Sequence, residues 1–258
     1  MSLSELSAGS CGAALALEGV SRRFGGFHAV SDLDLAVGAG ERRAILGPNG
    51  AGKTTLFNLV TGDLPVSAGH IRLDGTDVTT LATPARIARG LRRTYQLALL
   101  FDGLSVEENL YLAVQGSRGA SAGMMPLRAR DLRRQRAREL AARVDLAALL
   151  PQPAGTLSHG QRRQLEIGMA LAGDPRILLF DEPAAGLSPA ERELLAALIL
   201  DLPRTITLVM IEHDMDIALT LADVVSVLDK GRLIAEGTPE EIVNDARLHE
   251  IYLGKGHA

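Results

Sequence analysis

Short segments with the character of strands alternate along this chain with longer segments whose apolar residues recur every three or four positions. Residues 176–182 and 205–212 each contain a continuous apolar run, as expected for strands buried on both faces of a parallel sheet, and residues 41–46 form a further short strand. Residues 158–172 and 188–202 have the spacing of helices, and each begins with a serine that can cap the helix. This alternation of strand and helix predicts the α/β class.

A mainly helical block at residues 97–172 interrupts the predicted sheet. We therefore expect a single domain at 13–254, in which 13–96 and 173–254 form the core and residues 1–12 form a flexible tail. Within the block, residues 127–144 carry many arginines, with Leu132, Leu140 and Val144 as an apolar stripe between them. Two interpretations of this basic segment stay open: a solvated helix face, or a contact with an acidic partner or lipid headgroups.

Composition narrows the class of protein. The chain has 258 residues, 47% of them hydrophobic, and a formal net charge of -4, so nucleic acid is not a favoured partner. A disulfide framework is impossible with one cysteine, Cys11, which suits a reducing compartment. We expect neither a signal peptide nor a membrane-spanning helix, because the longest apolar runs are far below roughly 18 residues.

The strongest chemical signal is a glycine-rich loop between a predicted strand and a predicted helix. Its residues fit the pattern G-x-x-x-x-G-K-[ST]: Gly47, Pro48, Asn49, Gly50, Ala51, Gly52, Lys53, Thr54 and Thr55. Glycines let the backbone approach a ligand closely, and successive N–H groups form a nest for anions. Lys53 can reach the β- and γ-phosphates of a nucleotide, the Thr54 hydroxyl can bind Mg²⁺, and a helix starting near Lys53 would direct its dipole at the phosphates.

Two carboxylates follow an apolar strand further along the chain. Asp181 and Glu182 end the segment 176–182, so both should lie at the carboxyl edge of the sheet, where open α/β folds bind ligands. Asp181 can hold Mg²⁺ through its water shell, and Glu182 can orient or deprotonate a water in line with the γ-phosphate. Phe24, one of few aromatic residues, could stack on adenine or simply pack in a turn, and both interpretations stay open.

Together these motifs resemble those of the ATP-binding cassette (ABC) ATPases. Residues 157–161 (Leu-Ser-His-Gly-Gln) resemble the family signature LSGGQ, Gln96 matches the Q-loop, and residues 184–188 match the D-loop. His213 matches the switch histidine and Phe24 the adenine-stacking aromatic. The one departure is His159, where the signature has glycine. The order and spacing fit over about residues 15–254.

The resemblance implies a P-loop NTPase fold with a mostly parallel core sheet, an N-terminal antiparallel β region and an inserted α-helical subdomain that carries the signature. It also implies ATP and Mg²⁺ as cofactors, with Mg²⁺ near Thr54, Gln96 and Asp181. Catalysis would involve Glu182, Gln96 and His213. In a head-to-tail dimer of ATPase subunits, identical or different, the signature residues Ser158, Gly160 and Gln161 would contact the γ-phosphate held by the partner's P-loop.

Shorter motifs resemble those of the ATPase subunits of branched-chain amino acid importers, namely residues 93–96, 184–187, 212–215, 235–239 and 252–254. The Gly/Ser-rich loop and the basic segment before the signature resemble the larger of the two ATPase subunits that such importers usually have. The expected partners are transmembrane permease subunits, a second ATPase subunit and, indirectly, an extracytoplasmic substrate-binding protein, with no nucleic acid. The expected location is peripheral, at the cytoplasmic face of the inner or plasma membrane. Importers of urea or short amides and lipid transporters remain alternatives, as does a soluble ABC ATPase acting in DNA maintenance or translation.

Overall fold

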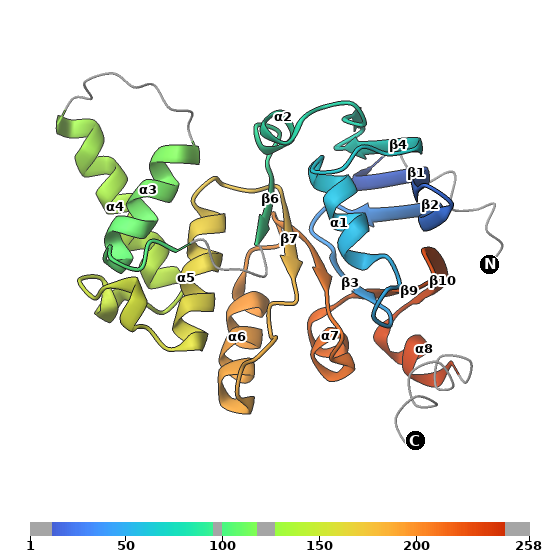
Figure 1. Ribbon diagram of the computed structural model, residues 1–258. Helices are drawn as coiled ribbons and strands as arrows, with labels where there is room; N and C mark the ends of the chain where they lie inside the picture. The colour runs from blue at the N-terminus through green and yellow to red at the C-terminus, as the bar shows by residue number, and fades with distance from the viewer. Residues whose placement is uncertain (1–11, 95–99, 118–126, 246–258) are drawn as a thin grey trace. The chain divides into compact units, whose positions relative to one another are not determined.

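The computed structural model describes residues 12–94, 100–117 and 127–245. The chain folds into two compact units (Figure 1). The first comprises Met1–Leu91, Arg176–Glu182 and Leu202–Ala258, and the second comprises Arg92–Pro175 and Pro183–Asp201. The domain boundaries expected from the sequence, at 96/97 and 172/173, stay a prediction.

Some predicted features fall outside the described residues. They are Gln96, Cys11, almost all of the expected tail at 1–12, and the end of the resemblance near residue 254. Among the residues that are described, no helix is both long enough and apolar enough to cross a membrane.

The main sheet, of which all strands except β6 lie within the first unit, has the predicted parallel centre. Its strand order is β10-β9-β3-β8-β7-β6, with bounds β3 (Arg42–Leu46), β6 (Leu91–Thr94), β7 (Ile177–Asp181), β8 (Thr207–Ile211), β9 (Val224–Asp229) and β10 (Arg232–Gly237). β3 pairs in parallel with both β8 and β9, and β7 pairs in parallel with β8, whereas β9 and β10 form the predicted antiparallel hairpin. All residues of β3, β7 and β8 are buried, which explains the continuous apolar runs 177–180 in β7 and 208–211 in β8. β3 instead begins with two buried arginines, Arg42 and Arg43.

A second, antiparallel sheet is formed by the N-terminal strands, as expected. Its order is β2-β1-β4-β5, with bounds β1 (Ala13–Phe24), β2 (Phe27–Gly38), β4 (Ala68–Leu73) and β5 (Thr76–Asp77). The sequence predicted that β1 ends near Val20 and that Arg22 to Gly26 form a turn, which is wrong. β1 continues to Phe24, which pairs with Phe27, so the turn holds only Gly25 and Gly26.

Helix α1 (Lys53–Thr61) packs in the core between these two sheets (Figure 1). Leu56 and Leu59 of α1 belong to the same buried cluster as Leu33 of the antiparallel sheet and Ile45 and Val209 of the main sheet. The other helices of this unit are α2 (Thr83–Ile87), α7 (Met215–Leu221) and α8 (Pro239–Asn244). The helix that follows the glycine-rich loop is therefore held by apolar contacts on both sides.

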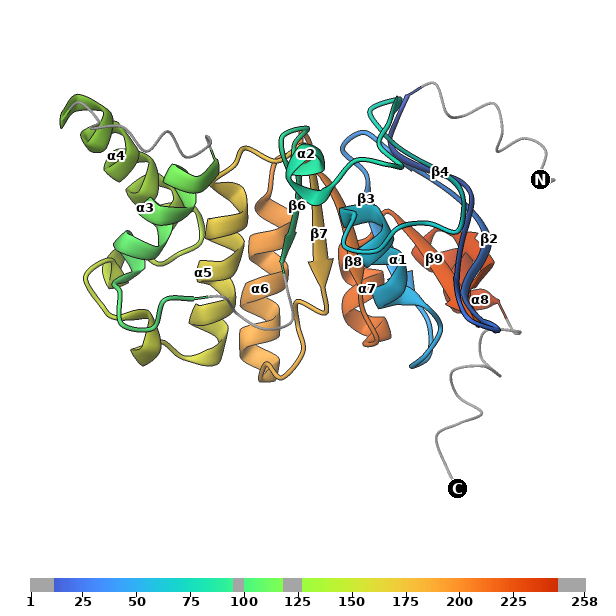
Figure 2. The ribbon, with the colours of Figure 1, turned by 45° about the horizontal axis from the view of Figure 1, so that its top comes forward.

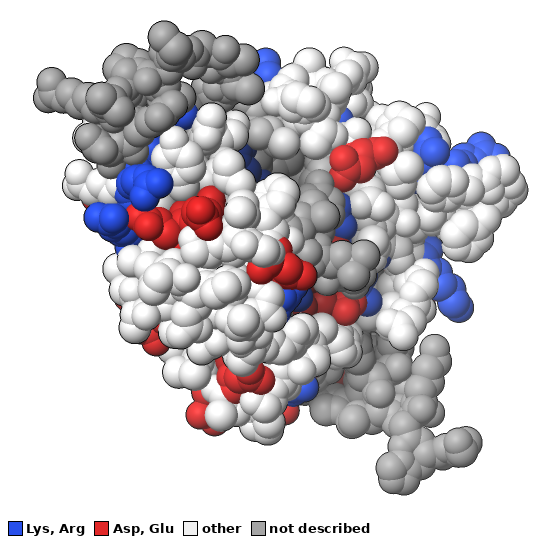
Figure 3. Space-filling view, turned by 60° about the vertical axis from the view of Figure 1, so that its left-hand side comes forward, with Lys and Arg blue, Asp and Glu red and all other residues white. Residues whose placement is uncertain are grey.

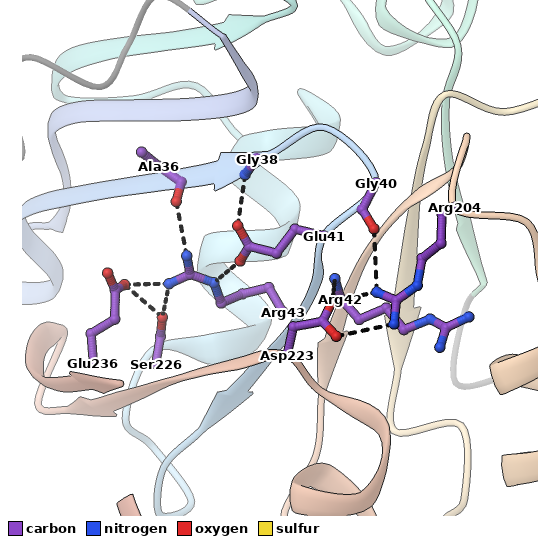
Figure 4. A network of polar contacts seen from close by, with 10 residues as sticks. All are labelled: Ala36, Gly38, Gly40, Glu41, Arg42, Arg43, Arg204, Asp223, Ser226 and Glu236. Carbon is purple, nitrogen blue, oxygen red and sulfur yellow. Dashed lines mark hydrogen bonds and ion pairs between the residues drawn. The ribbon is translucent and has the colours of Figure 1, made fainter. Parts of the chain in front are cut away.

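A buried arginine joins the two sheets at the start of β3 (Figure 4). The Arg43 side chain donates hydrogen bonds to the Glu41 carboxylate at 2.5 Å, the Ser226 hydroxyl at 2.8 Å, the Ala36 carbonyl at 2.9 Å and the Glu236 carboxylate. These partners come from β2, β9, β10 and the segment before β3. Because each donor of a buried guanidinium needs an acceptor, this arrangement fixes the strand that leads into the loop.

The second unit is a bundle of helices that lie side by side (Figure 2). They are α3 (Val106–Ser117), α4 (Leu127–Arg143), α5 (His159–Leu171) and α6 (Pro189–Asp201), with short 3₁₀ turns at Ala147–Leu149 and Ala154–Thr156. Leu110, Leu140 and Leu165 from three of the helices are fully buried. The sequence predicts a capping box at Ser105 as well as the helix start at Ser158, and both are confirmed. Ser105 and Glu108 bond to each other's backbone N–H at the start of α3, and Ser158 and Gln161 do the same at the start of α5.

The apolar stripe predicted for the basic segment, which contains helix α4, is wrong at one position. Leu140 and Val144 are fully buried, but Leu132 is 61% exposed. Two arginines of α4 have an acidic neighbour within the unit, because Arg138 and Arg134 reach Glu107 at 2.8 and 3.9 Å. On the face shown in Figure 3, basic and acidic side chains lie next to one another. This local pairing favours the interpretation of α4 as a solvated helix face.

Candidate functional site

The glycine-rich loop links β3 to α1 as the sequence predicts. Leu46 ends β3, the loop occupies residues 47–52, and Lys53 is the first residue of α1. Gly52 caps the helix in the left-handed conformation, with φ of 101°. A Cβ at Gly52 would lie 2.4 Å from the Ala29 carbonyl oxygen, so only glycine fits this position. The free N–H groups of the first turn of α1 therefore follow a loop that can come close to an anion.

Lys53 lies inside the loop that it follows. Its side chain is nearly buried, and its ammonium donates hydrogen bonds to the carbonyl oxygens of Gly47 at 2.5 Å and Pro48 at 3.2 Å. Burial lowers the pKa of Lys53, whereas the charges of Glu182 and Asp181 act in the opposite direction. The negative charges of Glu182 and Asp181 therefore act on the Lys53 ammonium, and the three side chains belong to one electrostatic site.

The carboxylates lie where the sequence predicts, at the carboxyl end of β7. Asp181 is the last residue of the strand and is 2% exposed. Glu182 follows with φ of 49°, a left-handed conformation that is costly for a side chain other than glycine or asparagine. Its N–H donates to the Ile211 carbonyl at 3.0 Å, which ties the end of β7 to β8. Strain of this kind is concentrated at functional sites.

His213 follows the neighbouring strand and faces the same carboxylate. Its Nδ1 atom lies 3.8 Å from Oε2 of Glu182, and both side chains are accessible to solvent. The next residue, Asp214, caps helix α7 by accepting from the N–H groups of Asp216 and Ile217. The sequence analysis did not predict α7, although an aspartate before Met215-Asp216 is a recognisable helix start. That cap fixes the backbone immediately after His213.

Because β3, β8 and β7 are neighbouring parallel strands, their carboxyl ends share one edge of the sheet. The loop, the Asp181–Glu182 pair and His213 therefore meet in the first unit. Oxygen donors of the kind that Mg²⁺ prefers are present there, namely the exposed hydroxyl of Thr54 and the carboxylate of Asp181. Gln96, the third predicted magnesium residue, lies outside the described residues.

Phe24 ends β1 with its ring 45% exposed. The Arg22 guanidinium lies over the ring, 4.6 Å from its centroid, and is held by a hydrogen bond to the Pro65 carbonyl at 2.9 Å. The paired strand β2 contributes Ala29, whose carbonyl oxygen limits the space at Gly52. Phe24 thus belongs to a hairpin that adjoins the loop and carries a partly exposed aromatic ring, which suits a planar ligand.

The signature residues lie in the second unit, at the start of α5. Ser158 is the N-cap, and its hydroxyl accepts from the Gln161 N–H while the Gln161 side chain accepts from the Ser158 N–H. Gly160 donates its N–H to Oε1 of Glu191, at 3.0 Å. His159 reaches over the D-loop, with Nε2 3.4 Å from the Ala185 carbonyl oxygen. The three predicted residues, Ser158, Gly160 and Gln161, therefore share one helix N-terminus.

The structure adds one contact to the loop that no sequence pattern indicated. The turn between β9 and β10 reaches the loop, because the Gly231 N–H donates to the Ala51 carbonyl at 2.8 Å. The Gly231 carbonyl in turn accepts from the Ser31 N–H at 2.8 Å. The sequence predicted this glycine only as part of a hairpin turn, since a contact between residues 180 positions apart leaves no local signal.

Comparisons with known proteins agree with this geometry. The sequence model of the family described as "ABC transporter" matches residues 30–185, and that described as "Branched-chain amino acid ATP-binding cassette transporter" matches residues 232–258. The high-affinity branched-chain amino acid transport ATP-binding protein BraF of Pseudomonas aeruginosa is 38% identical over 249 residues, covering 93% of this chain and 98% of that protein. The lipopolysaccharide export system ATP-binding protein LptB of Escherichia coli (strain K12) is 34% identical over 251 residues, covering 94% and 98%.

The solved structures that resemble this chain are also ATP-binding cassettes of ABC transporters. The crystal structure of the ADP conformation of an ATP-binding cassette of an ABC transporter has a TM-score of 0.82 and 30% sequence identity, covering 94% of this chain and 99% of that chain. A nucleotide-free ATP-binding cassette from an ABC transporter has a TM-score of 0.81 and 29% identity, covering 94% and 100%. The predicted fold class is confirmed by these neighbours and by the two sheets described above.

Proposed function

The chain belongs to the ABC transporter family as an ATPase subunit, and we propose that it energises an importer of branched-chain amino acids. The observation that carries the proposal is the edge of the main sheet, where the loop with Lys53, the pair Asp181–Glu182 and His213 meet. The similarity to BraF and the match of residues 232–258 to a branched-chain amino acid transporter family support the substrate class.

In the proposed reaction, loop residues 47–55 bind the phosphates of ATP through backbone N–H groups and the ammonium of Lys53. Glu182 accepts a proton from the attacking water and holds that water in line with the γ-phosphate. His213, whose Nδ1 atom lies 3.8 Å from Oε2 of Glu182, contacts the γ-phosphate. It loses this contact when the γ-phosphate leaves after hydrolysis. Phe24 stacks on the adenine ring.

Mg²⁺ fits the donors at this edge, and Thr54, Asp181 and Gln96 are the residues that would hold it. When bound, it would neutralise charge that develops on the phosphate oxygens. Asp181 is nearly buried at the end of β7, so the folded sheet keeps that carboxylate in place before any ligand arrives.

A second ATPase subunit, identical or different, would complete each site. The N-terminus of α5, with Ser158, Gly160 and Gln161, would contact the γ-phosphate bound by the loop of the partner in a head-to-tail dimer. The N–H groups in the first turn of α5 and the positive end of the helix dipole support this role. Hydrolysis would then weaken the interface.

Transmembrane permease subunits would hold the chain peripherally at the cytoplasmic face of the membrane, and a substrate-binding protein would act on it through them. We propose that they dock on residues 96–108. Phe101 in this segment is 54% exposed, and buried Asn109 holds its backbone by accepting from the Phe101 N–H at 2.9 Å and donating to its carbonyl at 3.1 Å. Phe101→Glu should prevent co-purification of the permease subunits, whereas Leu132→Glu, at an equally exposed leucine on α4, should not.

A lipid transporter is the second candidate, because LptB is 34% identical over most of the chain. One experiment separates the two. The complex that co-purifies with the tagged chain is reconstituted with its binding protein, and ATP hydrolysis is measured with leucine, isoleucine or valine, and with lipopolysaccharide, urea and short amides as comparison ligands. Stimulation by the branched-chain amino acids supports the proposal, while stimulation only by lipid or by amides contradicts the substrate class.

A further inference from the structure

One carboxylate joins the N-terminal ends of two helices in the second unit. Oε2 of Glu191 accepts hydrogen bonds from the N–H of Ser188 at 3.0 Å and from its hydroxyl at 2.8 Å, which completes the capping box of α6. Oε1 of the same carboxylate accepts from the Gly160 N–H of α5 at 3.0 Å and lies 3.4 Å from the Ser158 hydroxyl oxygen.

The two donors on α5 are those that the proposed function assigns to a phosphate. A carboxylate oxygen and a phosphate oxygen are both anionic acceptors, and both are favoured at a helix N-terminus. The fit at Gly160 is close, because a Cβ there would lie 2.8 Å from Oε1 of Glu191. The Gly160 N–H of the signature helix is therefore already hydrogen-bonded to an anion, the Glu191 carboxylate of the same subunit.

Glu191 can release Gly160 without undoing α6. Its bonds to Ser188 are made by Oε2, whereas its contacts with the signature are made by Oε1. The two roles are therefore carried by different oxygen atoms of one carboxylate, and its negative charge stays close to any phosphate that takes the place of Oε1. That charge repels the polyphosphate of ATP, most strongly when water is excluded from the interface.

We propose that Glu191 is an internal competitor for the signature N–H groups and sets the ATP concentration at which the composite site closes. The inference rests on the proposed function, since it requires that the signature binds the γ-phosphate held by a second ATPase subunit. Glu191 acts through Gly160 and Ser158, so it is a positioning residue.

The test is ATP hydrolysis by the complex purified through a tag on the full-length chain. Glu191→Gln removes the charge but keeps a side chain that can complete the capping box. We expect it to lower the apparent KM for ATP about two- to ten-fold, the range for one charge at a helix N-terminus, with an unchanged or lower kcat. The matched control is Glu193→Gln, which removes the same charge from an exposed position two residues further along α6 and should leave KM unchanged.

Salt provides a second readout that loss of a helix cap would not produce. The difference in KM between Glu191→Gln and the unaltered chain should shrink as the salt concentration rises from about 50 to about 500 mM, because ions screen the repulsion. An unchanged or higher KM in Glu191→Gln, or an equal fall in Glu193→Gln, overturns the inference. Ser158→Ala with full ATPase activity would instead overturn the role of the signature in the proposed function, so the two failures are distinguishable.

Discussion

The backbone N–H of Gly231 donates a hydrogen bond to the carbonyl oxygen of Ala51, at 2.8 Å. Ala51 lies in the phosphate-binding loop, and Gly231 lies in the turn between β9 and β10. The turn also touches β2, because Gly231 accepts from Ser31. The loop is therefore held by two elements that are distant in sequence, in addition to the strand and helix on either side of it.

Replacing Gly231 by alanine should loosen the loop. Gly231 has φ of 77°, and a Cβ would lie 2.6 Å from the Ala29 carbonyl oxygen. The left-handed conformation alone costs roughly 1–2 kcal/mol for alanine, and the clash adds to this by displacing the turn. We expect ATP affinity, measured by isothermal titration, to fall at least ten-fold.

The matched control is Gly75→Ala. Gly75 has a similar φ of 74°, but nothing lies within 4 Å of the position that its Cβ would take. This variant should lose about 1–2 kcal/mol of stability in urea unfolding and keep its ATP affinity. Equal affinities in both variants would show that the contact between turn and loop is not needed for binding.

Much of this site was predictable because its signals are local. The loop from Gly47 to Thr55 follows a fixed pattern, and the strand before Asp181 is apolar at every position because both faces are covered. The capping boxes at Ser158 and Ser188 likewise predicted where two helices begin. In each case the residues that determine the structure are neighbours in the sequence.

The parts of the fold and of the site that the sequence did not predict depend on contacts between residues that are distant in the sequence. The extension of β1 through Arg22 to Phe24 is stabilised by pairing with β2, so only Gly25 and Gly26 remain in the turn. The bond from Gly160 to Glu191 and the position of Gly231 against Ala51 depend on how helices and strands pack. Leu132 on α4 was predicted to belong to the apolar stripe from periodicity, yet it is exposed. Among the described side chains of residues 132–144, the buried apolar ones are Ala137, Leu140, Ala141 and Val144.

Glu182→Gln should separate binding from hydrolysis. Glutamine has nearly the same shape but cannot accept the proton from water, and loss of a general base lowers turnover by about 10²- to 10⁴-fold. ATP affinity should be retained, because Lys53 and the loop N–H groups are unchanged. The two measurements are steady-state ATPase activity and equilibrium nucleotide binding, with Glu240→Gln on the exposed side of α8 as the control. Near-normal activity in Glu182→Gln would remove this residue from the mechanism.

Arg86 should be essential for stability although it is remote from the phosphate-binding end of α1. It is 1% exposed and donates to the Leu59 and Val60 carbonyls at the end of α1, at 2.7 and 2.8 Å, and to the Leu81 and Thr79 carbonyls at 2.9 Å. Burial lowers the pKa of Arg86, and the charges of Asp63 and Asp77 oppose that shift. Arg86→Met would leave these buried carbonyls without donors.

We expect Arg86→Met to lower the free energy of unfolding by about 3–5 kcal/mol, measured by urea denaturation. Arg86→Lys should recover part of this loss, since one ammonium cannot reach all four acceptors. Arg89→Met is the control, because Arg89 is exposed and bonds only locally, to the Ala85 carbonyl, so its loss should change stability by less than about 0.5 kcal/mol. A small effect at Arg86 would mean that the carbonyls find other donors.

Phe24 and Phe27 are direct cross-strand partners, and this pair can decide between the two interpretations of Phe24. Both rings are exposed, by 45% and 64%, and the Arg22 guanidinium lies over one face of Phe24. If Phe24 stacks on adenine, Phe24→Ala should weaken ATP binding by roughly 1–3 kcal/mol, or about 5- to 150-fold, and should leave the affinity for tripolyphosphate unchanged because that ligand has no base. Phe27→Ala should affect neither ligand. A loss of affinity for both ligands in Phe24→Ala would indicate that Phe24 supports the hairpin by packing, because a displaced hairpin would disturb the loop through Ala29 and Gly52 whatever ligand is bound.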